Sequence, residues 1–121
     1  LLREARKGTF VCLSPDMDLG RKDSEFVPFF GVSTNTVLSV SKMARVAGAE
    51  VCPIFTVLRE DGSGYDCHVG KPWVDFPTDD AVADTARMNQ AFEDVIKPRI
   101  AEYYWVHKRF KNRPEGEASI Y

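Results

Sequence analysis

Apolar residues occur along this chain of 121 residues both in short runs and at helix-like spacing. A nearly continuous apolar run at 9–13 predicts a buried strand. Residues 51–58 are again nearly all apolar, which predicts a strand covered on both faces, with Pro53 near its start or on an edge. Residues 65–69 alternate between apolar and polar. They predict a half-exposed strand, joined to the preceding one as a hairpin by the turn at 60–64.

Helix-like spacing of apolar residues appears in two segments between and after these strands. The first helix is predicted to begin at a cap formed by Ser33 or Thr34 and to stop at Gly48. The second is predicted to run from an N-cap at Thr78 to about Lys97, after which a proline interrupts it. Strands that alternate with helices indicate an α/β fold in which helices pack on a mixed sheet.

A polar residue and an aromatic-rich tail stand out within the helical patterns. Asn89 lies on the otherwise apolar stripe of the second helix, and a buried amide without partners costs roughly 1–3 kcal/mol. We therefore expect Asn89 to form hydrogen bonds in the core rather than to act in catalysis. The tail, residues 103–116, is predicted to form a terminal helix with Tyr103, Val106 and Phe110 facing inward and several cations facing outward.

Composition and charge argue against several classes of function. The formal net charge is −2, so no bulk electrostatic argument points to nucleic acid, and no nucleic-acid motif is present. Cys12, Cys52 and Cys67 have no metal-ligand spacing and are predicted to be reduced thiols in the core. We expect no metal and no cofactor. Residues 1–8 have the pattern of a helix's last turns, which favours a portion of a longer protein.

The loop at residues 15–22 carries acids and bases close together. Asp16 and Asp18 are two residues apart, and Arg21 and Lys22 form a basic pair. The spacing of the loop's glycine and of the later glutamate excludes an EF-hand. In an α/β fold, the loops beyond the carboxyl ends of strands are where ligands are met. The two acids are therefore expected to pair with cations or to contact a ligand, with a solvated acidic turn as the alternative.

Five segments, in order along the chain, carry a family resemblance. They are PDMDLG at 15–20, FVPFFG at 26–31, VCPIFTVLR at 51–59, RMNQAFEDVIK at 87–97 and YYWVHKRFKNRPEG at 103–116. Together they resemble the late acyltransferases of lipid A biosynthesis, the lauroyl and myristoyl transferases of Gram-negative bacteria. The resemblance covers most of the chain, and its closing HKRFKNRPEG is specific.

The resemblance implies transfer of a fatty acyl group from acyl carrier protein to a hydroxyl of a lipid A precursor, at the cytoplasmic face of the bacterial inner membrane. It also implies a fold like that of the glycerol-phosphate acyltransferases, which use a His-x-x-x-x-Asp/Glu dyad to deprotonate the attacking hydroxyl. Neither His68 nor His107 is followed by an acid at the fifth position. The dyad and the family's membrane helix are therefore expected upstream of Leu1. Residues 1–121 are then a C-terminal portion of one acyltransferase domain, without catalytic residues, inactive alone and prone to self-association.

Relative position within the family also implies roles for the loop and for one strand end. Arg21, Lys22 and Arg59 are expected to bind the acceptor or to balance charges at its polar site. Asp16 and Asp18 are expected to fix the loop by pairing with cations. These roles place the acceptor's polar site at the 15–22 loop.

The tail admits a solvated basic face or a surface for anionic lipid and phosphate, because aromatic rings favour the membrane interface and cations its headgroups. On the second interpretation, Lys108, Arg109, Lys111 and Arg113 face the phosphorylated disaccharide or the leaflet. His107 either donates a hydrogen bond within this surface or has a structural role, and we favour the structural role. Two rival functions remain open at this point. One is a non-catalytic module that binds an anionic lipid or phosphate, and the other is a structural half-domain that completes the sheet of the enzyme.

Overall fold

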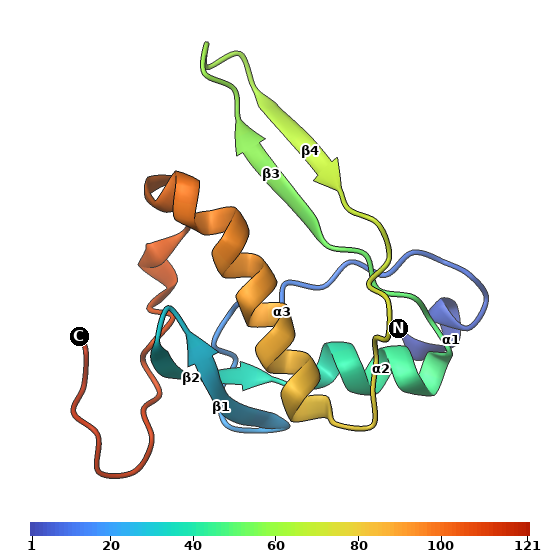
Figure 1. Ribbon diagram of the computed structural model, residues 1–121, viewed down its shortest axis with the longest axis horizontal. Coiled ribbons are helices and arrows are strands. Elements are labelled where there is room, and N and C mark those ends of the chain that lie inside the picture. The colour runs from blue at the N-terminus through green and yellow to red at the C-terminus, as the bar shows by residue number, and fades with distance from the viewer.

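The computed structural model describes every residue from 1 to 121. Its elements are α1 (Leu2–Ala5), β1 (Ser24–Phe29), β2 (Val32–Val37), α2 (Ser39–Ala47), β3 (Ile54–Leu58), β4 (Tyr65–Val69), α3 (Ala81–Ile96) and two short 3₁₀ helices, η1 (Lys97–Glu102) and η2 (Trp105–His107). The β1–β2 hairpin and the helices α2 and α3 form the body, from which the β3–β4 hairpin extends (Figure 1). The chain mixes helices and strands as expected, but the strands form two separate antiparallel sheets rather than one mixed sheet.

The β1–β2 hairpin is closed by a two-residue turn. Phe30 and Gly31 form this turn with φ of 50° and 73°, and positive φ at both positions gives the twist that a tight hairpin needs. The hairpin buries one face almost completely, since Val27 is 2% exposed and Phe29 is 0% exposed. This face is the surface on which α3 and the tail are assembled.

Helix α2 begins later than the sequence pattern predicts. The expected cap at Ser33 or Thr34 is wrong, because both residues pair with β1 as part of β2. The helix instead starts at Ser39, and it ends as predicted at Gly48, whose φ of 65° is the left-handed conformation that glycine adopts at helix C-termini.

Helix α3 lies against the β1–β2 hairpin and has the best-formed N-terminus in the chain (Figure 1). The cap is Asp80, whose side chain accepts hydrogen bonds from two backbone N–H groups of the first turn. The prediction of Thr78 as the cap is wrong, because its hydroxyl and its backbone N–H donate to Asp84 instead. The helix ends at Ile96, one residue before the predicted end.

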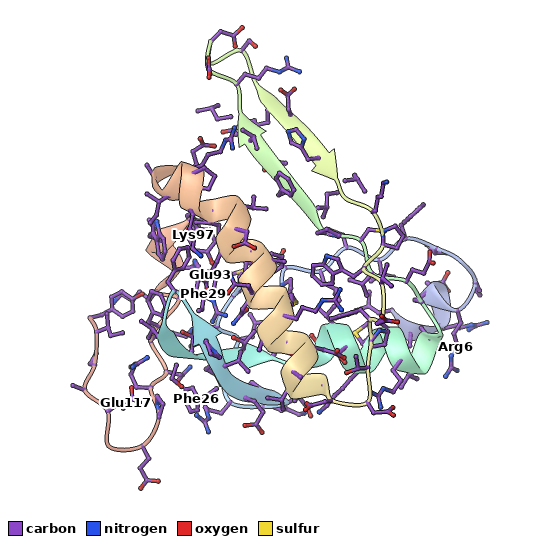
Figure 2. All side chains as sticks on the ribbon, viewed as in Figure 1. Arg6, Phe26, Phe29, Glu93, Lys97 and Glu117 are labelled. Carbon is purple, nitrogen blue, oxygen red and sulfur yellow. The ribbon has the colours of Figure 1, made fainter.

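Polar side chains on α3 join it to the β1–β2 hairpin. Asn89 is 0% exposed, and its Nδ2 donates to the Pro28 carbonyl at 2.9 Å and to Thr36 Oγ1 at 3.3 Å. Glu93 lies beside the hairpin turn (Figure 2), where its Oε1 accepts from the Phe30 backbone N–H at 2.7 Å. The expectation that Asn89 forms hydrogen bonds in the core is confirmed.

A small apolar cluster fills the space between α2, α3 and the chain that precedes α3. Its buried members are Val40, Phe76 and Met88, and Leu13, Val51, Trp73 and Phe92 pack against them from the side. Because so few residues are buried, polar contacts hold much of the remaining structure together.

The β3–β4 hairpin is confirmed, but its environment differs from the prediction. Ile54 pairs with Val69, and Pro53 precedes the strand directly, as predicted. Coverage on both faces is wrong, because residues of β3 alternate between half-buried and exposed and those of β4 are all exposed. The hairpin pairs with no further strand, so two strand edges stay open.

Three other expectations about local structure are wrong. Residues 9–13 form no strand because no neighbouring strand pairs with them, and Phe10 is fully exposed. All three cysteines are exposed rather than in the core. The tail is not a helix, because Lys108 takes a left-handed φ of 52° directly after η2, and Val106, expected inside, is 78% exposed.

Candidate functional site

Asp18 joins the 15–22 loop to β2 and to the tail. It is 5% exposed, and its Oδ1 accepts hydrogen bonds from the Gly20 backbone N–H at 3.1 Å, from Asn35 Nδ2 at 3.0 Å and from Asn112 Nδ2 at 2.7 Å. Its Oδ2 accepts from the Asn112 backbone N–H at 3.3 Å. The expected pairing of this acid with a cation is wrong, because amide N–H groups surround it.

Two opposing influences act on the pKa of Asp18. Burial raises the pKa, because a charged carboxylate loses hydration. The hydrogen bonds from Gly20, Asn112 and Asn35 lower the pKa, and together they prevail, so the pKa lies below its ordinary value. Asp18 is therefore an ionised carboxylate that holds the loop in place.

Arg109 is buried under the β1–β2 hairpin. The side chain is 0% exposed, its Nη1 donates to the Asn35 carbonyl at 2.7 Å, and its Nη2 donates to Thr36 Oγ1 at 2.7 Å. The guanidinium lies 5.2 Å from the centre of the Phe29 ring. Burial lowers the pKa of Arg109, while Tyr103 and the acids of the 15–22 loop act in the opposite direction. The expectation that Arg109 faces outward is wrong, because the irregular tail turns it into the core.

The other cations of the tail divide into two groups. Arg113 is also turned inward, since its side chain is only 14% exposed, its Nη1 donates to the Ser33 carbonyl at 2.7 Å, and it forms an ion pair with Glu117. Its predicted outward orientation is therefore wrong. Lys108 and Lys111 are exposed, as predicted, and Lys108 lies 5.7 Å from the centre of the Tyr121 ring.

Tyr103 and Asp16 lie close to Arg109 and face a pocket. Burial raises the pKa of Tyr103 well above its ordinary value, and the negative charge of Asp16 raises it further, while the positive charge of Arg109 opposes the shift. The Tyr103 ring contacts Trp105 edge-to-face at a centroid distance of 4.7 Å. The neutral phenol, the acid and the buried guanidinium thus form one polar group beneath the loop.

His107 has contacts only within the tail and its aromatic cluster. Its ring stacks on Tyr104 at a centroid distance of 5.9 Å, and its Nδ1 forms a hydrogen bond with the Tyr104 carbonyl. Neither contact involves an acid that would make the imidazole a general base. These contacts support the structural role that the sequence favoured for His107.

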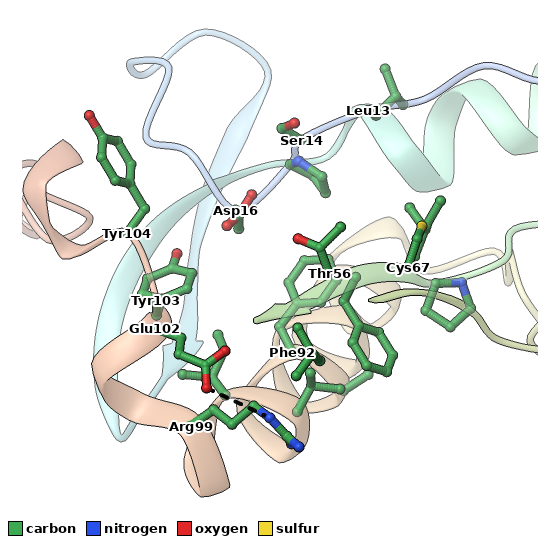
Figure 3. A pocket seen from close by; sticks show the side chains of 18 of the residues that line it. Leu13, Ser14, Asp16, Thr56, Cys67, Phe92, Arg99, Glu102, Tyr103 and Tyr104 are labelled. Atoms are coloured by element: carbon green, nitrogen blue, oxygen red, sulfur yellow. Dashed lines mark ion pairs between the residues drawn. The ribbon is translucent and has the colours of Figure 1, made fainter. Parts of the chain in front are cut away.

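The pocket lies between the β3–β4 hairpin, α3, the start of the 15–22 loop and the first residues of the tail, and its volume is about 470 Å³ (Figure 3). Most of its lining side chains are apolar, and the polar ones include Ser14, Asp16 and Tyr103. On the α3 side, Arg99 and Glu102 form an ion pair at 3.8 Å. No helix of the chain is both long and apolar enough to span a bilayer, and no three metal-binding side chains converge.

The remaining predicted site residues are not gathered around the acids of the loop. Arg21 lies over the Phe26 ring at 4.2 Å, and Lys22 is exposed beside it. Arg59 pairs with Asp66 at 2.8 Å on the β3–β4 hairpin. The structure therefore joins the loop to Arg109, whereas Arg59 forms a separate ion pair.

A family model described as bacterial lipid A biosynthesis acyltransferase matches residues 1–112. The chain belongs to this family. A palmitoleoyltransferase of lipid A biosynthesis from Escherichia coli K12 is 38% identical over 96% of the chain, which covers 38% of that enzyme. The lauroyltransferase of lipid A biosynthesis from the same organism is 37% identical over 100% of the chain, which covers 40% of that enzyme. The myristoyltransferase of lipid A biosynthesis from this organism is 30% identical over 99% of the chain, which covers 37% of that enzyme. The chain thus spans about two fifths of these acyltransferases.

Several residues that build the site in this family member were missed by sequence reasoning. Asn35, Thr36 and Asn112 supply the partners of Asp18 and Arg109, yet each looks like an ordinary polar residue in the sequence. One signal was available for the first two. The run of polar residues in β2 follows an apolar strand after a tight turn, and polar residues on a buried strand need partners.

Proposed function

We propose that the complete protein transfers a fatty acyl group from acyl carrier protein to a hydroxyl of a lipid A precursor. The observation that carries this proposal is the identity of 37–38%, across 96–100% of the chain, to enzymes named palmitoleoyl- and lauroyltransferases of lipid A biosynthesis. Identity that spans nearly the whole chain supports a shared chemistry, not merely a shared motif. The acyl donor and the acceptor position are parts of the proposal.

Within this reaction, we assign the chain to the acceptor side. Asp16 faces the pocket from the 15–22 loop, and Arg21 and Lys22 lie exposed on the same loop. A phosphorylated sugar would find cations there, and an acid able to accept a hydrogen bond from a sugar hydroxyl. Asp18 and Arg109 contribute as positioning residues, because their buried contacts fix the loop against β2 and the tail.

The general base of the reaction is proposed to lie outside residues 1–121. His68 is exposed and stacks on Phe55 at 5.1 Å, and His107 contacts the backbone of its own turn. Neither imidazole has the carboxylate partner that a His-x-x-x-x-Asp/Glu dyad supplies. The chain is then a C-terminal portion of a glycerol-phosphate acyltransferase-like domain and is inactive by itself.

We further propose that the complete enzyme acts at the cytoplasmic face of the inner membrane, where its lipid acceptor lies. Lys108 and Lys111 are the tail cations that remain exposed, and each cation close to an anionic leaflet contributes about 1 kcal/mol to adsorption. Arg109 and Arg113 do not take part, since both side chains are covered by protein.

Lipid analysis of cells tests the proposed function. The complete gene, and separately residues 1–121, are expressed in a Gram-negative strain that lacks its own late acyltransferases, and lipid A is examined by mass spectrometry. We expect the complete gene to add the mass of one fatty acyl group, and the chain alone to add nothing. Unchanged lipid A with the complete, membrane-associated protein would refute acyl transfer, and acylation by residues 1–121 alone would refute the placement of the base. Binding to anionic lipid without acylation would favour the non-catalytic module.

A further inference from the structure

Two apolar faces lie opposite each other across the pocket. Phe92, Val95 and Ile96 occupy positions i, i+3 and i+4 of α3, which places them on one side of that helix. Phe55 and Val57 are two residues apart on β3 and therefore share one face of the hairpin. All five residues line the same pocket, which Figure 3 shows from close by.

The two faces do not close on each other. The β3–β4 hairpin stands away from α3 and does not pack along it (Figure 1). Apolar surface that remains in contact with water is unfavourable, so a groove of this kind favours an apolar occupant. Its volume of about 470 Å³ lies within the range of about 300–1,000 Å³ that is common for ligand pockets.

The groove is polar at the end next to the 15–22 loop. Ser14, Asp16 and Tyr103 line this end, and the hydroxyl of Tyr103 is buried without a hydrogen-bond partner. On the α3 side, Glu102 Oε2 accepts a hydrogen bond from the Leu58 backbone N–H at 3.3 Å. That contact occupies the free edge of β3 at this point, so an added strand would lose a pairing site there.

We propose that this groove binds the fatty acyl chain, with the polar end of the chain at Asp16 and Tyr103. The inference rests on the proposed function and adds to it a location for the hydrocarbon. An unbranched hydrocarbon chain needs no hydrogen-bond partners and fits between two apolar walls, whereas an added strand would bring N–H and C=O groups that must be paired. The half-buried Val57 side chain then contributes to the selection of chain length.

The test uses the complete enzyme and measures kcat/KM for a series of saturated acyl donors of increasing length. Val57→Trp narrows the groove, and the matched control is Val69→Trp, on the same hairpin but 67% exposed and outside the groove. We expect Val57→Trp to lower kcat/KM for the preferred donor by at least about tenfold relative to a shorter donor, since one methylene in an apolar pocket is worth about 10- to 200-fold. Val57→Ala should shift the preference toward longer donors, and the control should keep the wild-type profile.

The outcomes separate this inference from the proposed function. If both Val57 variants lower the melting temperature but keep the wild-type ratio between donors, the groove is filled by another part of the polypeptide and the inference is wrong. If Val57→Trp does not fold, the ratio of kcat/KM between long and short donors, measured with Val57→Ala, decides whether the inference holds. An unchanged profile in an enzyme that still transfers acyl groups overturns only the groove, whereas the absence of acyl transfer by the wild-type enzyme overturns the proposed function itself.

Discussion

Replacing Asp18 by alanine should lower the stability of the protein markedly. The carboxylate accepts four hydrogen bonds from N–H groups. Two of them come from the side-chain amides of Asn35 and Asn112, which lie 17 and 94 residues after Asp18 in the sequence. A buried donor that loses its acceptor costs about 1–3 kcal/mol, so the two amides alone give a loss of about 2–4 kcal/mol after partial rehydration. Domains are stable by about 5–15 kcal/mol, so this loss is a large fraction of the total stability.

Thermal unfolding of the complete protein, followed by circular dichroism, measures this effect. The matched control is Asp79→Ala, because the Asp79 side chain is fully exposed and its ion pair with Arg45 at 3.1 Å is worth little in water. We expect Asp18→Ala to lower the melting temperature by several degrees and Asp79→Ala to leave it almost unchanged. Equal melting temperatures for the two variants would refute the role of Asp18 in joining loop, strand and tail.

The same residue predicts a dependence of stability on pH. The pKa of Asp18 is lower in the folded protein than in the unfolded chain, because its hydrogen bonds outweigh its burial. Its ionisation therefore stabilises the fold above the unfolded pKa of about 3.9, and this contribution is lost as the pH falls through the folded pKa. The stability difference between wild type and Asp18→Asn should narrow over this acidic range. A constant difference across it would contradict the lowered pKa.

Three further predictions follow from the site. Arg109→Lys keeps the charge but cannot bridge the Asn35 carbonyl and Thr36 Oγ1 with one planar group, so it should cost about 2 kcal/mol or more, and an unchanged melting temperature would contradict this. Tyr103, whose pKa is raised by burial, should ionise well above the ordinary tyrosine pKa of about 10, and a Tyr103→Phe variant that loses part of the ultraviolet titration near pH 10 would contradict this. Asp16→Asn in the complete enzyme should raise KM for the acceptor about tenfold, as expected for the loss of a charge-assisted hydrogen bond, and wild-type acceptor kinetics would remove Asp16 from the site.

Local patterns in the sequence predicted those elements whose causes are local. Gly48 ends α2 because only the backbone at that position decides the cap, and the β3–β4 hairpin follows from two strand-like runs around a glycine-rich turn. Asn89 was placed correctly because a polar residue on an apolar helical stripe must find partners. In each case, neighbouring residues carry the whole signal.

Elements that depend on distant partners were predicted wrongly. Ser33 and Thr34 are residue types that cap helices, but pairing with β1 makes them part of a strand. Arg109 was expected to face outward because the tail resembled a helix, yet its hydrogen-bond partners lie 73 and 74 residues earlier, and no pattern near Arg109 marks them. Residues 9–13 have a strand-like composition without a strand to pair with.

The most direct test of the central claim is an assay of the purified complete enzyme with a defined acyl-carrier-protein donor and a phosphorylated lipid A precursor. Mass spectrometry of the lipid product reports whether an acyl group has been gained. We predict a gain of one acyl group by the complete enzyme and none by residues 1–121 alone. A complete enzyme that binds the precursor but never increases its mass, or acylation by the 121 residues without the rest of the enzyme, would contradict the assignment of this chain to the acceptor side of an acyltransferase.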